Sequence, residues 1–233
     1  MQNDLRANLA HVRSQIAQAA SRVGRDPSAV KLVAVSKTHS AATISEAVAA
    51  GCHVFGENKV QEAEGKIVEI GRDKAEWHLI GHLQSNKARR AVQLFDMIQT
   101  IDSIELAKRL ERICSEENRA ELPILVQVDL AGEETKSGIS ERDVPELVEF
   151  LRGCKRLKFN GLMLLPPFFD DAEATRPFFV RLRKMRERLA AQNAFANDRG
   201  ELSMGMSHDF ETAIEEGATI VRVGTAIFGE RKR

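Results

Sequence analysis

The chain has 233 residues, of which 43% are hydrophobic and 29% are charged, with 34 basic and 34 acidic side chains. The apolar fraction excludes intrinsic disorder, and a chain of this length can bury a substantial core. Because the net charge is zero, neither a nucleic acid nor an anionic membrane is expected as a partner.

The chain opens with apolar residues that are spaced alternately four and three positions apart, which is typical of one face of an amphipathic helix. These residues are Leu5, Leu9, Val12, Ile16, Ala19 and Val23. Gly24 and Pro27 follow the stripe and mark its end. The pattern predicts one helix before the first strand.

Eight short runs rich in β-branched and aliphatic residues follow this helix. They span residues 31–36, 53–55, 78–80, 97–101, 123–129, 159–165, 202–204 and 220–224. Segments of helical period lie between them, and Ser40, Ser103 and Ser140 precede three of these as expected N-caps. Strands that alternate with helices indicate a parallel sheet. We therefore predict an α/β fold with one domain over residues 1–233, a (β/α)8 barrel of the TIM type; a doubly wound open sheet is the alternative.

Several familiar sites are disfavoured by the sequence. No G-x-G-x-x-G follows a strand and no P-loop motif occurs, so nucleotide binding lacks its usual support. His78 and His82 are four residues apart but lack the glutamate of H-E-x-x-H, and we expect no metal there. The basic residues between Arg181 and Arg188 alternate with apolar ones at helical spacing, which favours a solvated helix face over a nucleic-acid patch.

Location is indicated by the cysteines and the hydropathy pattern. The three cysteines form no C-x-x-C pair, which is typical of a reducing compartment. No run of 18 apolar residues occurs, and the first residues lack the apolar segment of a secretory signal. A cytoplasmic location is expected.

Lys37 lies where the first expected strand ends, at the edge where a barrel carries its active site. A lysine there is most simply the solvated end of a strand. If its amine points inward instead, desolvation lowers its pKa and makes it a competent nucleophile for a Schiff base.

The last two expected strands end in small and hydroxyl-bearing residues. Ser207 closes the segment Ser203-Met-Gly-Met-Ser207 and is an expected N-cap, and Thr225 closes Arg222-Val-Gly-Thr225. Such residues suit a phosphate dianion, although simple capping and tight turns would also explain them. Together with Lys37 they favour an aldehyde that carries a phosphate.

Seven motifs in the same order along nearly the whole chain resemble those of the pyridoxal 5′-phosphate homeostasis protein family (the YggS/PROSC group). They are Ala34-Val-Ser-Lys-Thr38, Phe55-Gly-Glu-Asn-Lys-Val-Gln-Glu62, Trp77-His-Leu-Ile-Gly-His-Leu-Gln-Ser-Asn-Lys87, Lys136-Ser-Gly138, Gly161-Leu-Met163, Ser203-Met-Gly-Met-Ser-His-Asp209 and Val221-Arg-Val-Gly-Thr-Ala-Ile-Phe-Gly229.

The resemblance implies a fold similar to the barrel domain of alanine racemase, with pyridoxal 5′-phosphate held by Lys37 as an internal aldimine. Ser207, Gly224 and Thr225 match the phosphate-binding positions of the family, and Arg222 matches the partner of the pyridine nitrogen. Motif residues that line the cofactor pocket are Asn58, His82 and Met163.

Two functions from different classes follow. The first is a carrier that buffers or delivers the cofactor for vitamin B6 homeostasis, possible recipients being apo-enzymes that depend on it. The second is an amino-acid racemase or decarboxylase. An arginine that faces the ring nitrogen keeps it unprotonated and weakens carbanion chemistry. Racemases of similar fold use a tyrosine from another subunit and an added β-domain, whereas this sequence has no tyrosine and ends shortly after Gly229. We expect a carrier that is not an enzyme and acts as a monomer.

Overall fold

The strands form a closed barrel in the computed structural model, which describes residues 4–132, 137–197 and 199–229. The strands are β1 (Lys31–Val35), β2 (Val54–Glu57), β3 (Glu76–Leu79), β4 (Met97–Ile101), β5 (Leu122–Asp129), β6 (Ile139–Ser140), β7 (Leu157–Leu164), β8 (Glu201–Met206) and β9 (Ile220–Val223). Every pairing is parallel. The ring runs β1-β2-β3-β4-β5-β7-β8-β9 and closes because β9 pairs with β1, while the two-residue β6 adds only to β5. The eight-stranded barrel is confirmed, and closure rules out the open sheet.

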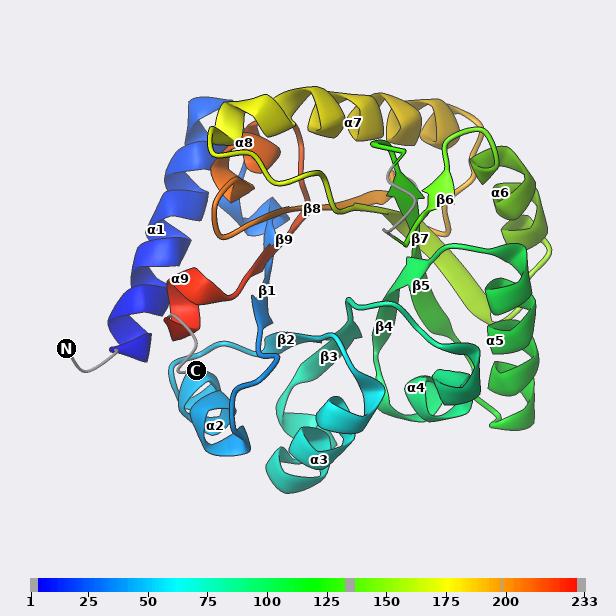
Figure 1. Cartoon of the computed structure of the whole chain (residues 1–233), viewed down its shortest axis with the longest axis horizontal. Helices are drawn as coiled ribbons and strands as arrows, with labels where there is room; N and C mark the ends of the chain where they lie inside the picture. Colours follow the sequence, from blue (N-terminus) through cyan, green and yellow to red (C-terminus); the bar gives the residue numbers. More distant parts are fainter. Residues whose placement is uncertain (1–3, 133–136, 198, 230–233) are drawn as a thin grey trace.

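Helices surround this ring of strands (Figure 1). They are α1 (Leu5–Arg22), α2 (Ala41–Ala49), α3 (Val60–Ile70), α4 (Ala88–Leu94), α5 (Ile104–Glu116), α6 (Val144–Arg152), α7 (Arg176–Ala191), α8 (Phe210–Glu215) and α9 (Thr225–Phe228). Short 3-10 turns occupy Pro27–Ala29, Arg72–Lys74, Ser85–Lys87 and Ala172–Thr175.

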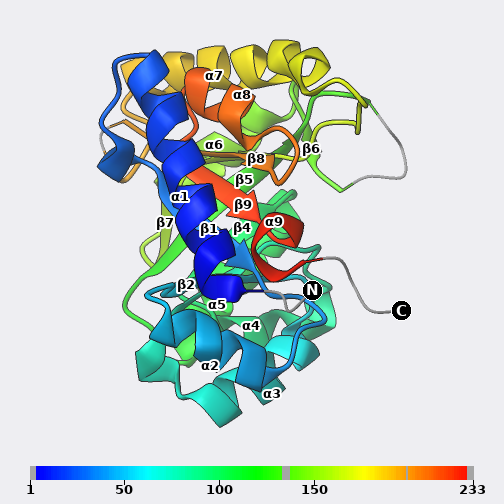
Figure 2. The same ribbon diagram turned by 90° about the vertical axis from the view of Figure 1, so that its left-hand side faces the viewer.

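The extra N-terminal helix α1 lies along the outside of the barrel against α8 and α9 (Figure 2). Its predicted apolar stripe is buried from Leu5 to Ala19, whereas Val23 lies past the helix end and is 43% exposed. Asp4 caps the helix by accepting a hydrogen bond from the N–H of Ala7. The stripe therefore attaches the helix to the barrel, as its spacing predicts.

The predicted helix starts are right in two places and wrong in two. Ser40 and Ser103 cap α2 and α5 with their side chains. Ser140 instead lies in β6, and α6 starts at Val144 because Pro145 fits only the first turn of a helix. Ser207 does not cap α8, which begins at Phe210; its hydroxyl accepts the N–H of Gly224.

Successive side chains of each strand point to opposite faces of the barrel, so the buried apolar residues form two clusters. Outward residues such as Ala34 pack under the helices in the main apolar core. Val33, Met97, Leu125, Met163 and Ile220 form a second, smaller cluster. Because residues in register on neighbouring strands share a face, Val33 also places its partner Arg222 inside the barrel. The lumen is thus partly apolar and partly polar.

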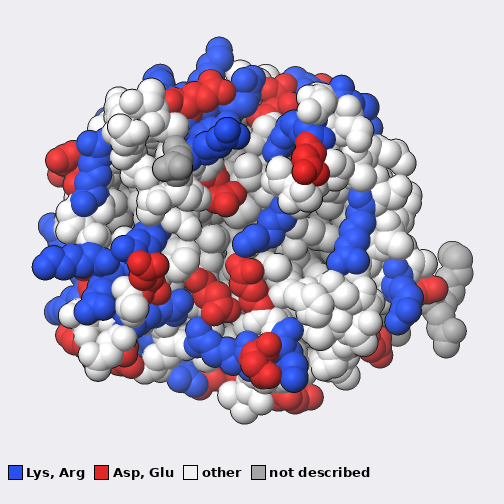
Figure 3. Space-filling view, turned by 180° about the vertical axis from the view of Figure 1, so that it is seen from behind, with Lys and Arg blue, Asp and Glu red and all other residues white. Residues whose placement is uncertain are grey.

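Acidic and basic side chains are interspersed over the face of the molecule in Figure 3. The basic residues of α7 follow this pattern, since Arg181 and Arg188 both pair with Glu141 and Arg183 pairs with Glu216. Within the described ranges, no helix is long and apolar enough to cross a membrane.

Candidate functional site

The predicted site residues gather toward the ends where the parallel strands finish. Lys37 lies two residues past β1, Asn58 one past β2, His82 three past β3 and Ser207 one past β8. Arg222 lies in β9, and Gly224 and Thr225 come directly after it, whereas Met163 lies within β7. Parallel strands end on the same side of a barrel. The structure therefore brings residues from five strands to one end of the barrel.

The segment after β9 passes directly beside the strand that carries Lys37. A Cβ atom built on Gly224 would lie 3.3 Å from the Cβ and carbonyl oxygen of Val35, so glycine allows this close approach. The Ser207 hydroxyl accepts the Gly224 N–H at 3.2 Å, which joins the ends of β8 and β9. Ser207 and Gly224 are thus joined next to β1, and Thr225 follows Gly224 directly.

The turn that carries Lys37 is held by a buried ion cluster, which we call the Lys66 cluster: Ser36, Glu57, Glu62 and Lys66. The Lys66 ammonium donates to the Ser36 carbonyl at 2.8 Å, to Glu57 Oε1 at 2.7 Å and to Glu62 Oε1 at 2.6 Å. The Ser36 hydroxyl donates to Glu57 Oε1 at 2.6 Å. Glu57 is fully buried, and burial raises the pKa of its carboxyl despite the bonds from Lys66 and Ser36.

The Lys66 cluster fixes the backbone on both sides of Lys37. Lys66 binds the carbonyl of the preceding residue, Ser36, and Glu62 accepts the N–H of the following residue, Thr38. Thr38 has a φ of 70°, a left-handed conformation that is uncommon for a β-branched residue. The hydrogen bonds therefore hold a turn that the local sequence does not favour by itself.

Arg222 is a buried cation, only 2% exposed. Its Nη1 donates to the Ser203 hydroxyl at 2.7 Å and its Nη2 donates to the Leu164 carbonyl at 2.8 Å. Burial lowers the pKa of the guanidinium to about 10, an effect that the negative charge of Asp209 opposes. Arg222 consequently remains charged at neutral pH and can only donate hydrogen bonds.

The three remaining predicted residues lie in different surroundings. The turn after β3 packs tightly over Asn58, since a Cβ on Gly81 would lie 2.3 Å from the Asn58 carbonyl oxygen. The His82 side chain is 54% exposed, and its Nδ1 lies 3.5 Å from Asp102 Oδ2. Met163 is fully buried in the lumen cluster, in register with Ser203. Met163 therefore packs in the barrel interior next to Ser203, the residue whose hydroxyl binds Arg222.

The side chains that support Lys37 and Arg222 were not predicted from the sequence. In α3 the buried positions are Val60, Ala63, Lys66 and Ile67, so a lysine stands within an apolar stripe. That position was a usable signal of a buried ion pair. Lys136, which is part of one family motif, lies outside the described residues.

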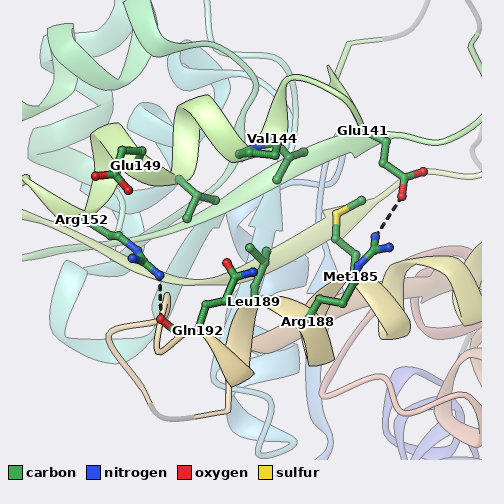
Figure 4. A pocket seen from close by; sticks show the side chains of 10 residues that line it. Glu141, Val144, Glu149, Arg152, Met185, Arg188, Leu189 and Gln192 are labelled. Carbon is green, nitrogen blue, oxygen red and sulfur yellow. Dashed lines mark hydrogen bonds and ion pairs between the residues drawn. The ribbon is translucent and has the colours of Figure 1, made fainter.

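A separate pocket of about 320 Å³ lies between α6 and α7 (Figure 4). Val144, Val148, Met185 and Leu189 provide its apolar lining. Its polar rim includes the ion pair between Arg188 and Glu141. None of the predicted site residues lines this pocket.

Comparison with known proteins first defines the class. The family model described as alanine racemase, N-terminal domain, matches residues 7–232. The solved alanine racemase of Corynebacterium glutamicum superimposes with a TM-score of 0.72 at 19% identity, covering 97% of this chain and 62% of that one. This likeness shows the fold: the chain is a barrel of the alanine racemase type.

The family within this class follows from relatives that align along almost the whole chain. The pyridoxal phosphate homeostasis protein of Escherichia coli strain K12 is 43% identical over 98% of this chain and 97% of its own. That of Aquifex aeolicus is 40% identical over 96% and 97%. The structure of PipY from Synechococcus elongatus, described with PLP bound, has a TM-score of 0.82 at 40% identity, covering 97% of this chain and all of that one. The chain belongs to the pyridoxal phosphate homeostasis protein family.

Proposed function

We propose that this protein binds pyridoxal 5′-phosphate through Lys37 and buffers or delivers it, without turnover of an amino acid. The observation that carries the proposal is the juxtaposition of Lys37 on β1 with Arg222, Gly224 and Thr225 on β9, which pairs with β1. The PLP-bound structure described for a relative of 40% identity supports the choice of ligand.

The residues at this end of the barrel fit the cofactor at both of its polar extremities. The Ser207 and Thr225 side chains and the nearby backbone N–H groups supply the donors that a phosphate dianion requires. Gly224 has no side chain to fill the space beside Val35. The cofactor itself supplies an aldehyde, with which a lysine amine condenses with loss of water.

Arg222 is the proposed partner of the pyridine nitrogen. Its Nη1 and Nη2 donate hydrogen bonds to the Ser203 hydroxyl and the Leu164 carbonyl, and these bonds fix the position of the guanidinium. Because a guanidinium only donates, the nitrogen facing it accepts a hydrogen bond and stays unprotonated. An unprotonated ring withdraws few electrons, which suits holding a cofactor better than removing an α-proton.

The carrier is favoured over the racemase by the available acid and base groups. The sequence contains no tyrosine, the residue that supplies the second acid or base in racemases of similar fold. We propose that the protein acts as a monomer. We further propose a cytoplasmic location and delivery to apo-enzymes that depend on the cofactor.

Two measurements test this proposal. The purified protein should show an absorbance band of lysine-bound cofactor, and Lys37→Ala should lose that band. Exchange of α-hydrogen for deuterium, followed by NMR over a panel of amino acids, should be slow with the loaded protein. Rapid exchange with loss of stereochemistry for any amino acid would defeat the carrier and restore the racemase.

A further inference from the structure

A continuous chain of buried hydrogen bonds crosses the barrel lumen and ends on Arg222. Arg222 Nη1 donates to Ser203 Oγ at 2.7 Å, and Ser203 Oγ donates to Gln99 Oε1 at 2.6 Å. Gln99 Nε2 lies 2.8 Å from His78 Nδ1, and His78 Nε2 lies 2.7 Å from Glu76 Oε1. We call Glu76, His78, Gln99 and Ser203 the lumen chain.

The lumen chain runs from the start of β3 across the barrel interior to β8. Glu76 is the first residue of β3, and its partly exposed carboxylate also accepts from Lys31 Nζ at 3.1 Å, at the start of β1. Gln99 on β4 and Ser203 on β8 belong to strands that are not neighbours in the ring, so their bond spans the lumen. His78, Gln99 and Ser203 are each fully buried.

The chemistry of the two terminal groups fixes the direction of every bond between them. Arg222 can only donate, so the Ser203 hydroxyl accepts from it and donates its own proton to Gln99 Oε1. The Gln99 amide must then turn its NH2 group toward His78 Nδ1, which accepts. His78 Nε2 consequently carries the proton and donates to the Glu76 carboxylate. His78 is neutral in this arrangement, with its proton on Nε2.

From this we propose that the lumen chain is a positioning device for Arg222, a role that rests on the proposed function of Arg222 toward the pyridine nitrogen. The lumen chain presents one oriented oxygen lone pair to Nη1 and ends on the carboxylate of Glu76, whereas the negative charge that acts on Arg222 is that of Asp209. Ser203 and the Leu164 carbonyl hold Arg222 in one orientation, and no carboxylate among the described residues is hydrogen-bonded to it. A carboxylate in direct contact would compete with the ring nitrogen for the same donors.

The alternative is that these residues only fill the lumen and satisfy one another locally. If the role is only local, a substitution of Gln99 should change the hydrogen bonds of His78 and Ser203 but leave Arg222 unaffected. The positioning role predicts that the change reaches Arg222 through Ser203, because Ser203 then loses the acceptor that orients its hydroxyl.

The first test uses the protein without cofactor. Nitrogen-15 NMR of the wild type should show His78 with a protonated Nε2 and an unprotonated Nδ1. The Nη1 signals of Arg222, assigned by their loss in Arg222→Lys, should show slow rotation about the Cζ–N bonds. Protonated Nδ1 of His78 in the wild type at neutral pH would overturn the proposal, and this measurement requires no lumen variant to fold.

The variants Ser203→Ala and Gln99→Leu should both abolish the slowly rotating Arg222 Nη1 signal. Thr100→Val is the matched control, because Thr100 is a buried neighbour of Gln99 whose hydroxyl donates to the Gly81 carbonyl. This control should leave the Arg222 signals unchanged. Unchanged Arg222 signals in folded Gln99→Leu would show that the chain acts only locally.

The second test uses the loaded protein. Ser203→Ala should raise the dissociation constant for pyridoxal 5′-phosphate about tenfold and shift the absorbance maximum of the bound cofactor, whereas Thr100→Val should do neither. A wild-type protein without any cofactor band would defeat the proposed function and leave the NMR result standing. A normal band together with an unaltered spectrum and affinity in Ser203→Ala would defeat only the positioning role.

Discussion

Replacing Lys66 by methionine should destabilise the fold and loosen the turn that carries Lys37. The substitution removes an ammonium that binds Ser36, Glu57 and Glu62, and it leaves the fully buried carboxylate of Glu57 without its cation. Breaking a buried ion pair on one side costs about 3–5 kcal/mol. Chemical denaturation of the apoprotein at pH 8 should show a loss of this size in the free energy of unfolding.

The pH dependence of that loss tests its cause. Burial already raises the pKa of Glu57 above its ordinary value, and without Lys66 the pKa rises further. A raised carboxyl pKa means that the folded state binds the proton more tightly than the unfolded state does. The stability deficit of Lys66→Met should therefore be largest above the folded pKa of Glu57 and shrink as the pH falls below it.

Two further variants complete this experiment. Glu57→Gln added to Lys66→Met should recover part of the lost stability, because the uncompensated charge is gone. Lys74→Met is the matched control: its ion pair with Asp73 is exposed, so this variant should leave the free energy of unfolding nearly unchanged. A loss below about 1 kcal/mol in Lys66→Met that does not depend on pH would refute the role assigned to the Lys66 cluster.

Three other predictions concern the cofactor site and the barrel lumen. Ser207→Ala and Thr225→Val should each weaken cofactor binding roughly 10- to 150-fold, since a charge-assisted hydrogen bond is worth about 1.5–3 kcal/mol; unchanged dissociation constants in both, and in the double variant, would count against the phosphate site. Arg222→Glu should favour ring protonation and speed α-hydrogen exchange by NMR even as it loosens the cofactor, and slower exchange would contradict the reasoning. Hydrogen bonds from His78 and Lys31 lower the pKa of Glu76 below its ordinary value of 4.5, against the effect of burial. Its contribution to stability is thus present above pH 4.5 and lost as the pH falls through the lowered pKa, so the stability difference between wild type and Glu76→Gln should shrink on acidification and not stay constant.

The sequence predicted the barrel because each strand and helix has its own local pattern. The stripe from Leu5 to Ala19 and the run from Met97 to Ile101 both reflect burial that repeats within one element. The starts of α6 and α8 were predicted at the wrong residues. A serine that precedes acidic residues can cap a helix, but its hydroxyl can instead bind a different segment. Ser207 makes the second kind of bond, to Gly224, which lies 17 residues away.

The site could be predicted only where a single motif carries the chemistry. Lys37 and Arg222 stand at strand ends that local patterns reveal, and the family motifs named their roles; those roles stay predictions. Ser203 and Gln99 are 104 residues apart, and nothing in either neighbourhood indicates that they meet across the lumen. Such contacts depend on the closure and register of the barrel, which no local pattern encodes.

The most direct measurement of the central claim is to find which residue bonds to the cofactor. The protein is loaded with pyridoxal 5′-phosphate, reduced with borohydride to make the link permanent, digested and analysed by mass spectrometry. We predict the pyridoxyl group on the peptide that contains Lys37, and no reducible absorbance band in Lys37→Ala. A modification on another lysine, together with an undiminished band in Lys37→Ala, would contradict the account.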